Sequence, residues 1–116
     1  MKPFIRLYKD QDVFQKAVDT LITNNVNRSD IYILSYDYDY TKEIVSKMGI
    51  NTAGVIEMGV KESIKAALEE RDKTMRKQFQ DFGFSEGEAE RYATSSNEGE
   101  TVLIVTNNTD LEKYLD

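Results

Sequence analysis

Residues 31–40 read Ile31-Tyr32-Ile33-Leu34-Ser35-Tyr36-Asp37-Tyr38-Asp39-Tyr40, and this stretch decides the predicted fold. Residues 31–36 have the composition of a buried strand, whereas residues 37–40 form an acidic and aromatic tip. In an extended chain successive side chains point to opposite faces, so Asp37 and Asp39 would turn away from Tyr36 and Tyr38. The tip follows the carboxyl end of a predicted strand, and we take it as the first candidate site.

The segments before this strand predict a β-α-β unit. Residues 4–8 have a strand pattern, and residues 13–22 place apolar side chains at the 3,4 spacing of one buried helix face. Asn24 and Asn25 are expected to end that helix, because asparagine tolerates the left-handed conformation. A right-handed crossover would make strands 4–8 and 31–36 parallel.

Capping residues set the expected bounds of the first two helices. Asp12, with Gln15 three residues later, marks the start of the first helix. Asp39 or Thr41 can cap a second, short helix. Gly49 stands where the end of that helix favours a residue with positive φ.

The second half of the chain predicts one long helix, a shorter helix and a last strand. The helical pattern of residues 60–82 would span roughly 35 Å, whereas six-residue strands reach only about 20 Å, so this helix should extend past its sheet. Gly83 is expected to end it. Ser85-Glu86-Gly87-Glu88 has the form of a capping box that starts the next helix.

The C-terminal part is predicted to contain a loop, a strand and a short helix. Residues 94–100 are polar and free of apolar side chains, which is typical of a mobile loop. Residues 101–106 carry apolar side chains on both faces, so this strand should be covered on both sides. Residues 109–112 form another capping-box pattern, which predicts a short terminal helix.

These elements predict a single α/β domain over residues 1–116. Its sheet is expected to be three-stranded and mainly parallel, with flanking helices and one long projecting helix. A ferredoxin-like α+β arrangement is the alternative.

Composition excludes several chemistries. The 116 residues include no Cys and no His, which excludes disulfides, Ser-His and Cys-His nucleophiles, and thiolate or imidazole metal ligands. The net charge of -6 repels nucleic-acid phosphates and anionic membrane surfaces, so neither is an expected partner. The apolar runs fall far short of the roughly 20 residues that cross a bilayer, and no apolar signal segment is present at the N-terminus. We expect a soluble, cytoplasmic protein.

Asp37, Asp39 and Tyr40 are the candidate ligand-binding residues. Open α/β sheets bind ligands just past the carboxyl ends of parallel strands, where paired carboxylates can hold Mg²⁺ against a phosphate. The structural interpretation, a helix cap at Asp39, is the stronger one, so no metal or cofactor is assigned. Residues 54–63 depart from a phosphate-binding loop because Val60 precedes Lys61, and we reject a nucleotide site there.

The long helix carries the candidate protein interface. Leu68, Met75 and Phe82 recur every seven residues, and Phe79 lies beside this row. Such a row is most simply a core face, but the predicted overhang would leave part of it in need of cover. We therefore predict a homodimer with Leu68, Met75, Phe79 and Phe82 at its interface.

Several short motifs occur in a characteristic order along the chain: Lys2-Pro3-Phe4, Ser29-Asp30-Ile31-Tyr32-Ile33-Leu34, Asp37-Tyr38-Asp39-Tyr40-Thr41, Asn51-Thr52-Ala53-Gly54 and Gly83-Phe84-Ser85. Together they resemble the heat-induced general stress protein family of the YflT type, over nearly the whole chain. The resemblance implies a small cytoplasmic protein of Gram-positive bacteria that is made under general stress. The family's biochemical activity is not established, and it brings no catalytic residues.

The resulting functional hypothesis is a non-enzymatic stress-response protein without a cofactor, which acts through protein contacts. The alternative is a small-ligand or Mg²⁺-phosphate binding domain at Asp37, Asp39 and Tyr40, with weak enzymatic activity conceivable there.

Overall fold

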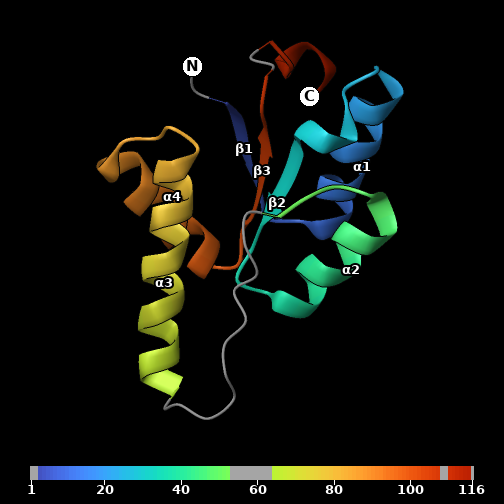
Figure 1. The fold of residues 1–116 in the computed structure, drawn as a ribbon. Helices are drawn as coiled ribbons and strands as arrows, with labels where there is room; N and C mark the ends of the chain where they lie inside the picture. The colour runs from blue at the N-terminus through green and yellow to red at the C-terminus, as the bar shows by residue number, and fades with distance from the viewer. Residues whose placement is uncertain (1–2, 53–63, 108–109, 116) are drawn as a thin grey trace.

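The computed structural model describes residues 3–52, 64–107 and 110–115, with residues 64–72 described by their helical backbone alone. In these residues, three strands and four α-helices form three layers (Figure 1). The elements are β1 (Phe4–Tyr8), α1 (Gln11–Thr23), β2 (Ile31–Leu34), α2 (Tyr38–Met48), α3 (Ile64–Asp81), α4 (Glu86–Asn97) and β3 (Thr101–Val105). Two short 3-10 turns, η1 (Arg28–Asp30) and η2 (Glu112–Tyr114), complete the chain.

The strand order is β1-β3-β2, and β3 runs antiparallel to both neighbours. Val105 of β3 lies opposite Phe4 on one side and Ile31 on the other. The predicted mainly parallel sheet is therefore wrong: β1 and β2 run in the same direction, but β3 separates them. Every residue of β3 is buried, and a strand that is apolar on both faces is best covered at the centre of a sheet.

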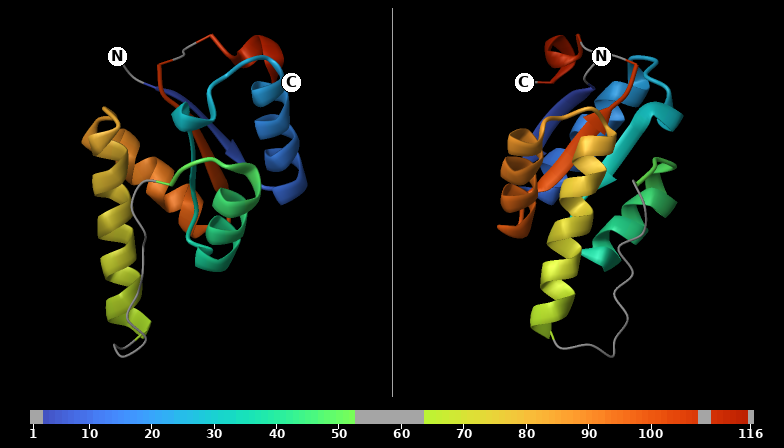
Figure 2. Two further views of the ribbon diagram at one scale, coloured as in Figure 1. Left: turned by 45° about the vertical axis from the view of Figure 1, so that its right-hand side comes forward. Right: turned by 60° about the vertical axis from the view of Figure 1, so that its left-hand side comes forward.

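Helices cover both faces of the sheet, so the ferredoxin-like alternative is also wrong, since an α+β sheet of that kind keeps its helices on one face. Helices α1 and α2 lie on one face and α3 and α4 on the other (Figure 2). Side chains alternate along each strand between the two layers. In β2, Ile31 and Ile33 join the first cluster, whereas Leu34 joins the second.

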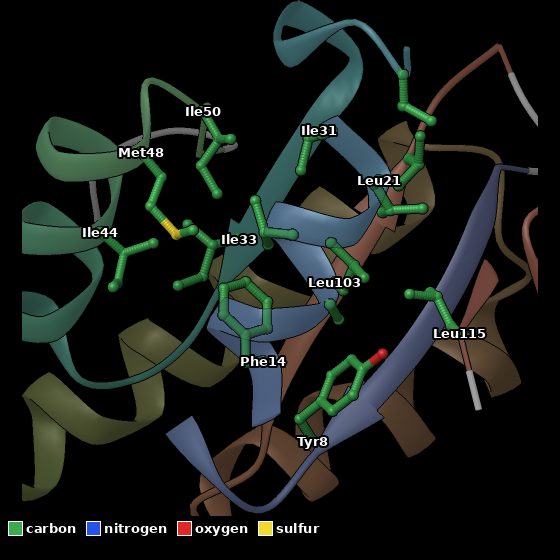
Figure 3. Close-up of a cluster of buried hydrophobic side chains, with 14 of the residues drawn as sticks. Tyr8, Phe14, Leu21, Ile31, Ile33, Ile44, Met48, Ile50, Leu103 and Leu115 are labelled. Atoms are coloured by element: carbon green, nitrogen blue, oxygen red, sulfur yellow. The ribbon is translucent and has the colours of Figure 1, made fainter. Parts of the chain in front are cut away.

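The first apolar cluster lies between the sheet and the helices α1 and α2 (Figure 3). Phe14 and Leu21 from α1, Ile44 from α2 and Leu103 from β3 are fully buried there. At roughly 1.5–3 kcal/mol for each large side chain, this burial is what holds α1 and α2 on the sheet. The position of α2 matters for function, because its N-terminus carries the candidate ligand site.

The ends of α1 and α2 follow local sequence signals, although the starts differ by two residues from the predicted ones. Asp10, rather than Asp12, caps α1, and Asp37, rather than Asp39 or Thr41, caps α2. The predicted ends are confirmed. Asn25 has a φ of 69° after α1, and Gly49 has a φ of 67° after α2.

The helices α3 and α4 form an antiparallel hairpin against the second face of the sheet. In Figure 1 and both views of Figure 2, the N-terminal end of α3 extends beyond the ends of the strands. The start predicted at residue 60 lies outside the described residues. The capping box of Ser85 and Glu88 is confirmed, and Gly83, with a φ of 106°, follows α3 as predicted.

Two predictions for the C-terminal part need correction. The mobile loop predicted for residues 94–100 is wrong, because α4 continues to Asn97 and buries Ala89, Ala93 and Ser96 on one face. The predicted terminal helix is only the 3-10 turn η2, and its capping residue Thr109 lies outside the described residues. The prediction that β3 is covered on both sides is confirmed.

Candidate functional site

The acidic tip lies between the end of β2 and the first turn of α2. Asp37 is the N-cap of α2, and its Oδ1 accepts a hydrogen bond from the backbone N–H of Tyr40 at 3.0 Å. The backbone N–H of Asp37 donates in turn to Oγ of Ser35, also at 3.0 Å. Asp39 is exposed in the first turn of the helix. Of the predicted pair, Asp37 therefore caps the helix, and Asp39 faces solvent.

Tyr40 lies inside the first apolar cluster and is only 8% exposed. Its hydroxyl is 3.4 Å from the carbonyl oxygen of Gln11 in α1. Burial raises the pKa of the Tyr40 hydroxyl above its ordinary value, and a hydrogen bond with the Gln15 side chain lowers it. Three carboxylates raise this pKa further: Glu43, Asp12 and Asp37. The phenol is accordingly neutral near pH 7 and packs as a core side chain.

The structure brings a second acidic pair to the same edge of the sheet. β1 and β2 run in the same direction, so α1 and α2 begin at the same end of the molecule (Figure 1). Oδ1 of Asp10 accepts from the backbone N–H groups of Asp12 at 2.8 Å and Val13 at 3.2 Å. Sequence reasoning missed this pair. The signal was present, because an Asp-x-Asp motif follows each of the two strands.

This arrangement supports helix starts better than metal coordination. Among the described side chains, those of residues 3–52, 73–107 and 110–115, the acidic groups form no cluster of three or more that could hold a metal ion. A carboxylate at a helix N-terminus is stabilised by the free backbone N–H groups and by the helix dipole. Asp10 and Asp37 use their charges in this way.

The predicted interface residues are placed largely inside the subunit. Met75 and Phe79 are 0% exposed in the second apolar cluster, and Phe79 packs against Tyr92 with ring centroids 5.5 Å apart. Phe82 is half-buried, and its ring centroid lies 5.1 Å from that of Tyr32. The side chain of Leu68 lies outside the described ones. Met75 and Phe79, which were predicted to be covered by a partner chain, are covered by α4 and the sheet of the same chain.

A groove follows the outer side of the α3–α4 hairpin and has a volume of about 400 Å³. Its α3 wall is mainly cationic and its α4 wall is anionic. The residues that line it are Lys73, Thr74, Arg76, Lys77 and Gln80 from α3, and Glu86 and Glu90 from α4. The interface predicted from the sequence was confined to the apolar row of this helix and did not include the charged face.

The family described as "Heat induced stress protein YflT domain" matches residues 3–99 of the chain. The chain belongs to the YflT family. General stress protein 17M of Bacillus subtilis (strain 168) is 31% identical over 108 residues, which cover 93% of this chain and 94% of that protein. No solved structure matches the chain. The YflT match takes in both the acidic tip and the charged hairpin and ends just before β3, and it confirms the resemblance drawn from the sequence motifs.

None of the helices in the described part of this YflT-family chain combines the length and the apolar composition that a membrane span requires.

Proposed function

We propose that this YflT-family protein serves the general stress response in the cytoplasm as a non-enzymatic protein that acts through contacts with other protein chains. Membership of the YflT family and the likeness to General stress protein 17M support the stress-response role. The non-enzymatic mode of action is supported by one structural observation: Asp37 caps α2, and Tyr40 is buried in the first apolar cluster. These are the groups that the sequence singled out for chemistry, and both hold α2 in place.

A reactive carboxylate or phenol has to present its polar atoms to a substrate. Oδ1 of Asp37 is directed to the backbone N–H of Tyr40, and the Tyr40 ring is buried among core side chains. Asp39 is exposed, and no hydrogen bond within the described residues holds its carboxylate in a fixed orientation. The charged α3–α4 hairpin, by contrast, offers an extended surface for a protein partner.

The rival function is a small-ligand or Mg²⁺-phosphate site at Asp37, Asp39 and Tyr40. One observation favours it, namely that an Asp-x-Asp motif stands at the start of each of the two helices α1 and α2, at the same edge of the sheet. Thermal shift measurements with nucleotides, Mg²⁺ and Mn²⁺ distinguish the two functions. A ligand at about 100 times its Kd would stabilise the protein by about 2.7 kcal/mol, whereas our proposal predicts no saturable shift. A shift that disappears in Asp39→Asn would establish the rival function.

A complementation experiment tests the proposal in cells. A Bacillus subtilis strain that lacks General stress protein 17M would receive either the wild-type chain or the Asp39→Asn variant. We expect both to restore survival after heat shock equally, because Asp39 is exposed and our proposal gives it no functional role. Failure of the wild-type chain would count against the stress role, and selective failure of Asp39→Asn would point to chemistry at the tip.

A further inference from the structure

We infer that the outer face of the α3–α4 hairpin is a self-complementary docking surface for a second copy of this chain. This inference rests on the proposed function, because it names the first partner in a mode of action that works through protein contacts. It also moves the interface to a different face of α3. The apolar residues Met75 and Phe79 are already covered by the chain itself, so they have no free surface to offer.

The α3 side of the surface is a row of basic and polar residues on one helix face. Lys73, Arg76, Lys77 and Gln80 follow the spacing i, i+3, i+4 and i+7, and all four are exposed. Arg76 interacts with another residue of its own chain, so we assign the docking contacts to Lys73 and Lys77. A local excess of positive charge is notable in a chain with a net charge of -6.

The α4 side carries the opposite charge. Glu86 and Glu90 are four residues apart and therefore lie one above the other on the same face of α4, where both are exposed. Among the described residues, neither Lys73 nor Lys77 forms an ion pair with Glu86 or Glu90. The groove of about 400 Å³ separates the two walls instead. Each wall thus keeps its charge available for another molecule.

The antiparallel hairpin places oppositely charged residues at similar heights. Helix α3 ends at Asp81 and α4 begins at Glu86, so Gln80 and Glu86 both lie within two residues of the turn that joins the helices. At 1.5 Å per residue, Lys77 is about 4.5 Å further along α3, and Glu90 is about 6 Å further along α4. Lys77 and Glu90 therefore lie at similar distances from the turn, on opposite walls of the groove.

The charge pattern selects one kind of symmetric dimer. A two-fold axis that runs between the two helices, along their mean direction, places α3 of one protomer over α4 of its partner in both halves of the interface. Lys77 of each protomer then faces the partner's Glu90. A two-fold axis perpendicular to the helices, within the interface plane, would place α3 over α3 and oppose like charges. Complementary potentials favour the first arrangement and penalise the second.

The size of the surface predicts a transient dimer. Helix α4 has 12 residues and is therefore about 18 Å long, and two adjacent helices are roughly 20 Å wide. The face of the hairpin thus covers roughly 360 Å², compared with about 800 Å² for each partner in a standard stable interface. Because exposed ion pairs supply much of the attraction, association should weaken as salt rises.

Sedimentation equilibrium of the purified full chain tests the inference. The wild-type protein is measured up to about 1 mM in about 0.05 M and about 0.5 M NaCl. We expect its average mass to rise toward that of a dimer with increasing concentration at low salt, and much less so at high salt. A wild-type chain that stays monomeric at the highest concentration in low salt would overturn the inference and leave this face to a different partner.

Charge-reversed variants then test which surface is used. The double variants Lys73→Glu/Lys77→Glu and Glu86→Lys/Glu90→Lys each give two walls of the same sign, so each alone should dimerise at least about tenfold more weakly. An equimolar mixture of the two should form a heterodimer, because every acidic wall then meets a basic one. Double variants that dimerise as well as the wild type, or a mixture that does not associate, would place the contact elsewhere and overturn the inference.

The matched control is Lys16→Glu/Lys42→Glu. It changes the net charge by the same amount on exposed residues of α1 and α2, in the opposite helix layer. We expect it to dimerise like the wild type. Weakening by this control as strong as that by Lys73→Glu/Lys77→Glu would mean that total charge governs association, which would overturn the assignment. The complementation experiment measures survival and the sedimentation experiment measures mass, so the stress role and the docking surface can fail separately.

Discussion

The side-chain hydroxyl of Tyr40 lies 3.4 Å from the backbone carbonyl oxygen of Gln11, so a residue of α2 reaches the first turn of α1. The ring beneath this hydroxyl belongs to the first apolar cluster. Tyr40 therefore joins the first turns of α1 and α2, through polar contacts of its hydroxyl with Gln11 and Gln15 and through a large buried ring.

Replacing Tyr40 separates these two contributions. Tyr40→Phe removes only the hydroxyl, with its hydrogen bonds to Gln11 and Gln15, and should lower the free energy of unfolding by about 1 kcal/mol. Tyr40→Ala also removes the buried ring and should cost about 3 kcal/mol or more. Urea titration of both variants measures the difference. Equal, small losses would show that the ring contributes little to the core.

Stability should fall in alkaline solution. Burial raises the folded-state pKa of both Tyr8 and Tyr40 above the ordinary value near 10. For a group whose pKa is raised on folding, the stabilising contribution is complete below the unfolded pKa and is lost as the pH rises through the folded pKa. Urea titrations from about pH 8 to about pH 11 measure this loss. A double variant with Tyr8→Phe and Tyr40→Phe should lose stability less steeply than the wild type above about pH 10.

The two carboxylates of the tip should differ in their effect on stability. Asp37→Ala removes the N-cap of α2 and should cost about 1 kcal/mol, because the backbone N–H of Tyr40 then lacks its partner. Asp39→Ala removes an exposed charge that makes only the general interaction with the helix dipole, so its effect should be smaller. Thermal unfolding of the two variants side by side checks this order. A larger loss of stability for Asp39→Ala than for Asp37→Ala would indicate that Asp39 is the N-cap of α2, as the sequence predicted.

Met75 is a core residue and should behave as one. Met75→Ala should cost about 2–5 kcal/mol, and Met75→Glu should unfold the subunit, because it buries a carboxylate without a partner. Gln80→Ala, on the exposed face of the same helix, is the matched control and should change stability by less than about 0.5 kcal/mol. Circular dichroism of Met75→Glu measures the outcome. A folded Met75→Glu protein would contradict the placement of α3 against the sheet.

Local signals in the sequence predicted the ends of helices well. Gly49 and Asn25 adopt the positive φ that their positions required, and the pair Ser85 and Glu88 forms its capping box. These features depend on a few adjacent residues, so the sequence contains all the information that they need. The starts of α1 and α2 were less certain because several aspartates within three residues could act as the cap.

Strand order could not be predicted in the same way, because it depends on contacts between distant segments. The β-α-β pattern gave the direction of β1 relative to β2 but not which strand lies between them. One clue was available. Residues 101–105 are apolar on both faces, which favours the centre of the sheet, whereas Arg6 in β1 and Tyr32 in β2 are typical of less protected positions.

The candidate site was predicted only in part, and for a related reason. Asp37, Asp39 and Tyr40 were found because they are adjacent in sequence, whereas Gln11 and Asp12 reach them through the fold. The end of α4 was misread because Thr94, Ser95 and Ser96 are small and polar, which resembles a loop. The burial of Ala89 and Ala93 on one face of α4 favours the helical conformation of this segment.

The central place of β3 also determines when the protein can fold during its synthesis. The ribosome makes β1 and β2 early, but neither can complete its hydrogen bonds until residues 101–105 have emerged. Until then two apolar strand edges remain unpaired and prone to aggregation, so nascent chains should depend on chaperones for most of their translation. Any chain terminated before residue 101 lacks the strand with which both β1 and β2 pair.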